Sequence, residues 1–276
     1  MADLGPQVDL HPRHHVVRIA AECLHVEGVP AFLQVRQEHR VVDVPQSVPV
    51  PPPHTDLVFK DRAHKHTVSS GKIGGMAGDR DVAAFDARAG RYESGWLGRL
   101  HQQLADRTAE LALAVAPAPP RILDVGCGTG YLLRELAARC PQAVELVGVD
   151  PAGGMIAAAR ATAVDDRLRW VEGTAEELAF PERSFDLVVS TTSFDHWADQ
   201  RAGLEECARV LTPGGWLVVT DLFSGWLAPT LVGSRRHKAR TKRRATRLLA
   251  GAGFQAVRWH GVGVVVIRAV TARRQL

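Results

Sequence analysis

The sequence of 276 residues contains no apolar run that approaches the roughly 18–20 residues of a membrane-spanning helix. Its N-terminus lacks the basic and then apolar segments of a secretory signal. Its four cysteines form no Cys-x-x-Cys pair, which argues against a disulfide framework or a zinc knuckle and is typical of a reducing compartment. We therefore expect a cytoplasmic protein without a membrane span.

The excess of positive charge is confined to one short segment. The formal net charge is +4, yet the stretch from Arg235 to Arg247 holds six Arg and two Lys and no acidic residue. Without these eight cations the rest of the chain would carry a net charge of −4. The run could be a solvated helix face, a site for an anionic substrate or a contact for nucleic acid. It has no aromatic residue to stack on bases, so nucleic acid is not the favoured partner.

The first 75 residues differ in composition from the remainder. They hold eight of the 16 prolines and eight of the 12 histidines. We expect a weakly structured leader at 1–75, with at most a hairpin between His15 and Val44, and a coherent domain at 76–276. The functional protein would then start at Met76. A histidine cluster at 11, 14 and 15 matches no familiar metal site, so we expect no bound metal.

From Met76 onward, helix and strand patterns alternate. The spacing of apolar residues predicts a helix over 83–116, ended by prolines at 117, 119 and 120. Strands follow at 121–125, 145–150, 168–172, 185–191, 216–222, 254–259 and 263–269, with helices at 131–140, 154–162, near Glu176, 201–211 and 241–250, and a turn at 212–215. This alternation predicts an α/β fold, with a doubly wound, Rossmann-like, mostly parallel seven-stranded sheet that has helices on both faces. Ligands of such folds bind at the carboxyl ends of the strands.

A glycine-rich turn follows the first strand of the sheet. Gly126, Gly128 and Gly130 allow a tight bend and let a ligand lie against bare backbone, and the helix that starts there offers unpaired N–H groups to an anionic group. A dinucleotide fingerprint would require glycine where Tyr131 stands. A phosphate-binding P-loop would require a lysine, and none occurs between Lys72 and Lys238. The turn therefore lacks the parts that are specific for phosphate.

Two acidic residues bracket this turn. Asp124 lies inside the apolar first strand, where a carboxylate is costly unless it meets a cation or hydrogen-bond donors. Asp150 ends the second strand, a position from which a carboxylate accepts hydrogen bonds from a ribose diol. The pattern indicates a nucleoside ligand with a charged tail that is not a phosphate, with its ribose at Asp150 and an amino group near Asp124.

These residues resemble a known family. Asp124-x-Gly126-x-Gly128-x-Gly130 followed by Asp150 resembles the S-adenosylmethionine site of class I methyltransferases, and the similarity continues in the stretches at 173–180, 185–190 and 209–216. It covers about residues 80–276 and is greatest to the small-molecule branch that includes the ubiquinone and menaquinone C-methyltransferases. The stretch at 84–93 resembles that branch's N-terminal segment, whose tyrosine, here Tyr92, helps to close the cofactor site. The leader has no counterpart.

The resemblance implies S-adenosyl-L-methionine as cofactor. The cofactor-binding residues that it implies are Tyr92, Asp124, Gly126, Cys127, Gly128, Thr129, Gly130, Asp150, Pro151, Met155, Thr174, Ala175, Glu176 and Ser190. In the family an aspartate stands where this sequence has Thr174, so either the Thr174 hydroxyl or Glu176 would meet the adenine edge. Cys127 is expected to be a small apolar filler of the loop.

His196 follows the fourth strand and is the candidate general base, because histidine titrates near neutral pH. In the family the corresponding histidine is often structural, and Asp195 is a similar candidate. The expected reaction is in-line displacement, in which an O, N, C or S atom of a small-molecule acceptor attacks the methyl group. The alternatives are an RNA or DNA methyltransferase that uses the segment from Arg235 to Arg247, a non-catalytic relative that binds the cofactor, and, with less support, an NAD-dependent dehydrogenase. The sequence leaves the acceptor and the oligomeric state open.

Overall fold

The computed structural model describes residues 82–223, residue 238 and residues 241–276, all of which belong to one structural unit. The expected leader at 1–75, its histidine cluster and the part of the basic run at 235–237 and 239–240 lie outside the described residues. The helices are η1 (Ala89–Arg91), α2 (Gly95–Val115), α3 (Tyr131–Arg139), α4 (Gly153–Thr162), η2 (Phe194–His196), α5 (Gln200–Val210) and α6 (Lys242–Gly251), preceded by a helical turn at 82–86. No helix in the described residues is long and apolar enough to cross a membrane.

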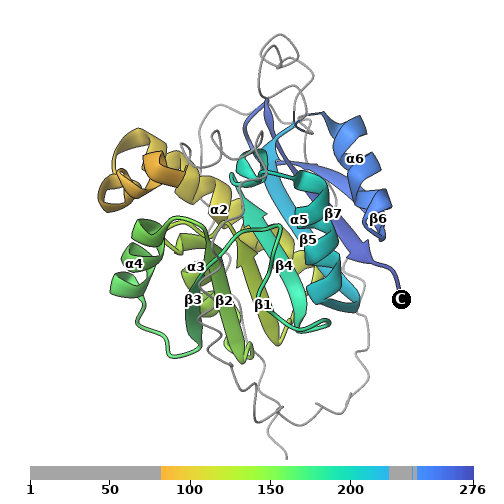
Figure 1. Ribbon diagram of the computed structural model, residues 1–276, viewed down its shortest axis with the longest axis horizontal. Coiled ribbons are helices and arrows are strands. Elements are labelled where there is room, and N and C mark those ends of the chain that lie inside the picture. The colour runs from red at the N-terminus through yellow and green to blue at the C-terminus, as the bar shows by residue number, and fades with distance from the viewer. Residues whose placement is uncertain (1–81, 224–237, 239–240) are drawn as a thin grey trace, which may run out of the picture. The chain divides into compact units, whose positions relative to one another are not determined.

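Seven strands form one mixed sheet. They are β1 (Arg121–Val125), β2 (Glu145–Asp150), β3 (Leu168–Glu172), β4 (Phe185–Thr191), β5 (Leu211–Leu222), β6 (Phe254–Gly261) and β7 (Ile267–Arg274). Their order is β3-β2-β1-β4-β5-β7-β6, and every neighbouring pair is parallel except the two pairs that β7 makes (Figure 1). The predicted doubly wound, mostly parallel seven-stranded sheet is confirmed. The strand order reverses between β1 and β4, which is where such sheets bind their ligands.

Helices cover both faces of the sheet because its strands are apolar on both sides. Ile122 of β1 packs in a cluster with residues of α2, α3 and α4. The next residue, Leu123, packs in a second cluster with residues of α5 and α6. This alternation follows from the period of two in a β-strand. The central strands are thereby held on both faces, which gives the residues at their carboxyl ends a rigid base.

The predicted long helix at 83–116 is interrupted. A helical turn at 82–86 and the short η1 precede α2, which begins only at Gly95. Gly95 has φ +72°, a value that an α-helix does not use, and Ser94 before it is extended. Residues 82–94 therefore form a separate segment, which we call the lid segment.

Four other predictions about secondary structure need correction. The segment near Glu176 is not a helix but an irregular loop with one β-bridge between Thr174 and Glu177. The turn expected at 212–215 is an irregularity inside β5, where the register with β4 shifts. The strand β6 runs on to Gly261, and β7 begins at Ile267 instead of at 263. Gly263 has φ +89°, and the alternating valines around it pack on Leu104 of α2, so they mark core contact and not a strand.

Candidate functional site

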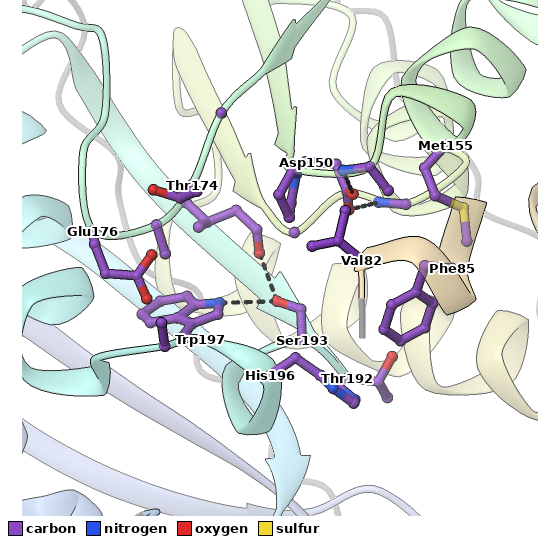
Figure 2. Close-up of a pocket in the computed structure, with 18 of the residues that line it drawn as sticks. Val82, Phe85, Asp150, Met155, Thr174, Glu176, Thr192, Ser193, His196 and Trp197 are labelled. Atoms are coloured by element: carbon purple, nitrogen blue, oxygen red, sulfur yellow. Dashed lines mark hydrogen bonds between the residues drawn. The ribbon is translucent and has the colours of Figure 1, made fainter. Parts of the chain in front are cut away.

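A cavity of about 520 Å³ opens at the carboxyl ends of the parallel strands. Its walls come from the residues after β1, β2, β3 and β4 and from the lid segment (Figure 2). This volume lies in the range of about 300–1,000 Å³ that is typical of small-molecule sites. The position agrees with the ligand site expected for a doubly wound sheet.

The glycine turn is built by three glycines with different constraints. All three have positive φ, which favours glycine: +75° at Gly126, +54° at Gly128 and +80° at Gly130. A Cβ on Gly130 would lie 2.2 Å from the ring of Trp170, so that glycine is required by packing under the loop. A Cβ on Gly128 would meet nothing closer than Tyr92, at 3.9 Å. Gly128 is therefore the glycine that leaves bare backbone facing the cavity.

The N–H groups of the turn are used to hold its shape. Those of Gly126 and Cys127 both donate to the Val149 carbonyl at 2.7 and 3.0 Å, and that of Gly130 donates to the Cys127 carbonyl at 2.9 Å. The N–H of Gly128 donates to Oδ2 of Asp150 at 2.9 Å. The expectation of unpaired N–H groups concerns the first turn of α3, which begins at Tyr131, and not these four residues of the turn. The bonds tie the turn to the end of β2.

Asp150 lies at the centre of this arrangement. Its Oδ1 accepts from the N–H of Ala152 at 2.9 Å, in addition to the bond from Gly128. Burial raises the pKa of its carboxyl, and the two backbone donors lower it and so partly offset that effect. Figure 2 shows Asp150 on the cavity wall beside Val82 and Met155. Its carboxylate has lone pairs left for further donors from the cavity side.

The lid segment is fastened over the cavity by two carboxylates. Oδ1 of Asp86 accepts from the N–H of Gly154 at 2.8 Å, in the first turn of α4. Oε1 of Glu93 accepts from the Thr129 hydroxyl at 2.6 Å and from the Arg134 guanidinium at 2.8 Å. Phe85 and Tyr92, each of which directly precedes one of these two attachments, line the cavity. Burial raises the pKa of Tyr92, so its phenol stays protonated near neutral pH.

The loop after β3 forms the opposite wall. Thr174, Ala175 and Glu176 line the cavity there. Oε1 of Glu176 accepts from the N–H of Asp199 at 3.0 Å, which links this wall to the start of α5. Figure 2 shows Glu176 next to the Trp197 ring, whose Nε1 donates to the Ser193 hydroxyl at 3.2 Å.

A second, smaller cavity of about 60 Å³ lies between the glycine turn and α2. Asp124 lines it, together with His101 of α2 and Thr191 at the end of β4. Within the described part of the chain, Oδ1 of Asp124, Nδ1 of His101 and Oγ1 of Thr191 are buried without a hydrogen-bond partner. Burial, and next the charge of Asp150, raise the pKa of Asp124 to about 8. Buried polar groups are rarely left unpaired in folded proteins, so these three atoms suit a ligand.

The structure gathers most of the predicted site residues around the two cavities. The larger cavity is lined by Tyr92, Gly126, Gly128, Asp150, Pro151, Met155, Thr174, Ala175, Glu176 and His196. The smaller one is lined by Tyr92, Asp124, Gly126, Cys127, Gly128 and Thr129. Gly130 and Ser190 line neither cavity. Ser190 is fully buried, and its hydroxyl shares a 2.8 Å hydrogen bond with that of Ser193, which does line the larger cavity.

The two candidates for proton transfer are placed differently. His196 lines the larger cavity, and its ring packs edge-on against Phe85 with centroids 5.0 Å apart. Asp195 is buried, and its backbone N–H donates to Oδ2 of Asp221 at 3.1 Å. Burial raises the pKa of Asp221 to about 6. The structure thus leaves His196, and not Asp195, in a position to face a ligand.

Several lining residues were not singled out from the sequence. Phe85, Thr192, Ser193 and Trp197 line the larger cavity, and His101 lines the smaller one. For the residues at 192–197, the position directly after the fourth strand could have indicated that they line the site. Thr192 also has φ +54°, which is uncommon for a residue other than glycine. His101 carries no signal in the sequence, because its position in a helix resembles any polar helix residue.

The described part of the basic run lies mainly on α6. Lys242 and Arg243 are exposed, and the ammonium of Lys242 lies 5.7 Å from the centre of the Trp259 ring. Lys238 instead donates to the carbonyl of Trp197, a residue of the cavity wall. One cation of the run therefore contacts the backbone of a cavity-wall residue, although Lys238 itself does not line the cavity.

Comparisons with known proteins agree with this geometry. Residues 123–219 match the family described as methyltransferase domain. The demethylmenaquinone methyltransferase of Deinococcus radiodurans is 45% identical over 117 residues, which are 42% of this chain and 48% of that protein. The demethylmenaquinone methyltransferase of Thermus thermophilus is 42% identical over 142 residues, which are 50% of this chain and 63% of that protein. The chain therefore spans about half to under two thirds of the length of these relatives.

A solved structure with the same fold is the methyltransferase of Haloferax volcanii in complex with the Trm112 methyltransferase activator. It superposes with a TM-score of 0.58 at 22% identity, over 70% of this chain and 98% of that one. The fold and the matched residues confirm the resemblance seen in the sequence. Residues 123–219 thus match a methyltransferase domain, and over about half of its length the chain is similar to the demethylmenaquinone methyltransferases, which belong to the quinone branch of that class.

Proposed function

We propose that this protein transfers a methyl group from S-adenosyl-L-methionine to a small-molecule acceptor. The observation that carries the proposal is the placement of Asp124 and Asp150. They lie on the neighbouring strands β1 and β2, and each lines a cavity that also borders Gly126 and Gly128. One buried carboxyl faces a small space that two further unpaired polar atoms share, and the other faces a large, mainly apolar space, an arrangement that fits an amino-acid tail joined to a nucleoside.

The residues around the larger cavity fit the nucleoside part. Asp150 would accept hydrogen bonds from the ribose diol, and Pro151 and Met155 would line the adenine pocket. Thr174, Ala175 and Glu176 would meet the adenine edge; because the Glu176 carboxylate already accepts from Asp199, the Thr174 hydroxyl is the freer of the two groups. When bound, the cofactor supplies a methyl group on a positively charged sulfur, which an acceptor atom can attack directly.

The chain would contribute mainly alignment and exclusion of water. The lid segment places Phe85 and Tyr92 on the cavity wall, and its two carboxylate attachments hold it there. Alignment of two reactants can supply about 7–11 kcal/mol of a barrier. His196 is placed to accept a proton from an acceptor that must lose one.

The acceptor that we favour is a flat, apolar ring. Phe85, His196 and Trp197 line the cavity, with the Phe85 and His196 rings in edge-on contact, and aromatic walls pack well on a planar ring. The similarity to demethylmenaquinone methyltransferases supports the same class, because their named substrate carries a fused quinone ring. No observation favours a nucleic-acid acceptor over this one.

The test is to incubate the full chain with methyl-labelled cofactor and a fractionated cell extract, and separately with a reduced naphthoquinone that lacks a substituent beside its oxygen. Label is expected in the small apolar molecules, and Asp150→Ala serves as the matched control. Label in RNA or DNA would contradict the acceptor class. Cofactor binding without transfer to any fraction would identify a non-catalytic relative.

A further inference from the structure

Three elements that are distant in the sequence each bring one unpaired polar atom to the smaller cavity. His101 comes from the second turn of α2, Asp124 from β1 and Thr191 from the end of β4. All three line the cavity of about 60 Å³, and Nδ1, Oδ1 and Oγ1, respectively, are buried without a partner among the described residues. An isolated unpaired atom can be an accident of packing, but three around one cavity form a site for a group that donates hydrogen bonds.

The chemistry of the three atoms selects the kind of group. Burial lowers the pKa of His101, so its imidazole is neutral and one of its ring nitrogens is a hydrogen-bond acceptor. A carboxyl oxygen and a hydroxyl oxygen are acceptors as well. A primary ammonium has three N–H donors and no acceptor. The cavity of about 60 Å³ has room for an ammonium group and its carbon.

We propose that His101, together with Asp124 and Thr191, binds the α-ammonium group of the cofactor. The proposal rests on the proposed function for the identity of the ligand and adds two binding residues, His101 and Thr191, to the site. Asp124 supplies the counter-charge, and Nδ1 of His101 accepts one N–H while Nε2 carries the ring proton. Thr191 accepts another N–H through its hydroxyl.

The lid segment holds the imidazole in place. The His101 ring stacks on Tyr92 with centroids 5.0 Å apart and an interplanar angle of 23°. Tyr92 lines both cavities, so it joins the ammonium site to the site for the nucleoside. The protein should therefore discriminate between nucleosides that carry an amino-acid tail and nucleosides that lack one.

The test compares two probes on the full chain. S-adenosylhomocysteine carries the ammonium-bearing tail, and 5′-methylthioadenosine has the same nucleoside without it. His101→Phe retains an aromatic ring against Tyr92 but has no acceptor nitrogen. In titration calorimetry it should lower the affinity for S-adenosylhomocysteine by about tenfold. The affinity of His101→Phe for 5′-methylthioadenosine should stay within twofold of the wild-type value. His101→Asn, which keeps a short acceptor, should recover part of the loss.

The control is His260→Ala, which removes a half-buried histidine bonded to Thr271 on β7, away from both cavities. It should leave both affinities unchanged. A second measurement needs no variant: the ¹⁵N shifts of His101 in the wild-type protein should report a change at Nδ1 on adding S-adenosylhomocysteine but not on adding 5′-methylthioadenosine.

The outcomes separate the two proposals. If wild type binds neither probe, the proposed function fails and the ammonium site fails with it. If wild type binds both and His101→Phe weakens them equally, or weakens neither, only the role of His101 is overturned.

Discussion

Gly126 and Ser193 lie so close together that no larger residue fits at 126. A Cβ on Gly126 would lie 2.2 Å from Oγ of Ser193, and that hydroxyl is fixed by its 2.9 Å bond to the Val125 carbonyl. The glycine turn after β1 is therefore packed directly against the loop after β4. Two loops that are 67 residues apart in the sequence form one wall of the larger cavity.

Gly126→Ala should destabilise the protein by about 2–4 kcal/mol, because it combines a strained positive φ with overpacking against Ser193. Gly128→Ala is the matched control, because it has positive φ but its Cβ would meet only an ordinary contact with Tyr92 at 3.9 Å, and it should cost only about 1–2 kcal/mol. Urea unfolding measures both. Equal losses of stability in the two variants would show that the Ser193 side chain moves aside without an energetic penalty.

Asp150→Ala should weaken the binding of the cofactor by about 2–4 kcal/mol, because two charge-assisted hydrogen bonds to the ribose are lost. Because Asp150 also holds the N–H groups of Gly128 and Ala152, part of the loss would come from a looser turn. Asp150→Asn keeps one acceptor oxygen and should lose less. Calorimetry that finds unchanged affinity in both variants would remove Asp150 from the site.

The raised pKa of Asp124 makes stability depend on pH. The ordinary pKa of 3.8 applies to the unfolded chain, and burial followed by the charge of Asp150 raises it to about 8 in the folded protein. Between these values the folded state holds a proton that the unfolded state has lost, so stability falls as pH rises from about 4 to 8. The slope from this group is at most about 1.4 kcal/mol per pH unit.

Asp124→Asn should remove this contribution and flatten the measured dependence, because an amide does not titrate. Asp166→Asn, on the surface, is the control and should leave the slope as it is in wild type. Denaturant unfolding at several pH values provides the measurement. Asp221 contributes a slope of the same sign below about pH 6, so a residual slope there is expected.

Binding of the cofactor should release a proton near pH 7. An ammonium beside Asp124 favours the ionised carboxylate, whereas without a ligand the raised pKa keeps it mostly protonated. Affinity for S-adenosylhomocysteine should therefore increase as pH rises from 6 to 8. Calorimetry in buffers of different ionisation enthalpy measures the proton release, and Asp124→Asn should abolish it. If the wild-type protein released no proton on binding S-adenosylhomocysteine, this result would contradict a cation beside Asp124.

Glu93→Gln should loosen the lid segment by weakening its attachment to Thr129 and Arg134. The ion pair is partly exposed, so the loss of global stability should stay below about 1 kcal/mol. Hydrogen exchange at 82–94 should nevertheless become faster, and the cofactor should dissociate several-fold faster. Arg107→Ala, which removes an exposed ion pair with Glu110 on α2, should change neither quantity.

His196→Ala should leave cofactor affinity within about twofold of wild type, because the residue lies with Phe85 and Thr192 on the part of the wall away from Asp150 (Figure 2). If His196 is the base, turnover should fall by about 10²–10⁴ with an acceptor that must lose a proton. Single-turnover measurements with the true acceptor decide this. Turnover equal to wild type would assign His196 to packing against Phe85.

The sequence by itself determined the sheet, the glycine turn and the two acids, because each follows from local chemistry. Alternating apolar segments of five to seven residues predict buried strands, and glycine at 126, 128 and 130 is required by the local backbone. The predictions that failed concern sequence patterns that are compatible with more than one kind of local structure. Valines near 264 looked like a strand but pack on α2, and the residues near Glu176 looked helical but form a wall loop.

The tertiary structure alone decided which side chains share a cavity. His101, Asp124 and Thr191 meet only because α2 packs on the sheet face beside β1 and β4, and nothing in their spacing along the chain records that contact. The same packing leaves Ser190 buried beneath the site and sets the pKa of Asp124, because burial depends on every neighbouring element. Local sequence determines which groups are available at a strand end, whereas the docking of distant helices determines which of them face a ligand.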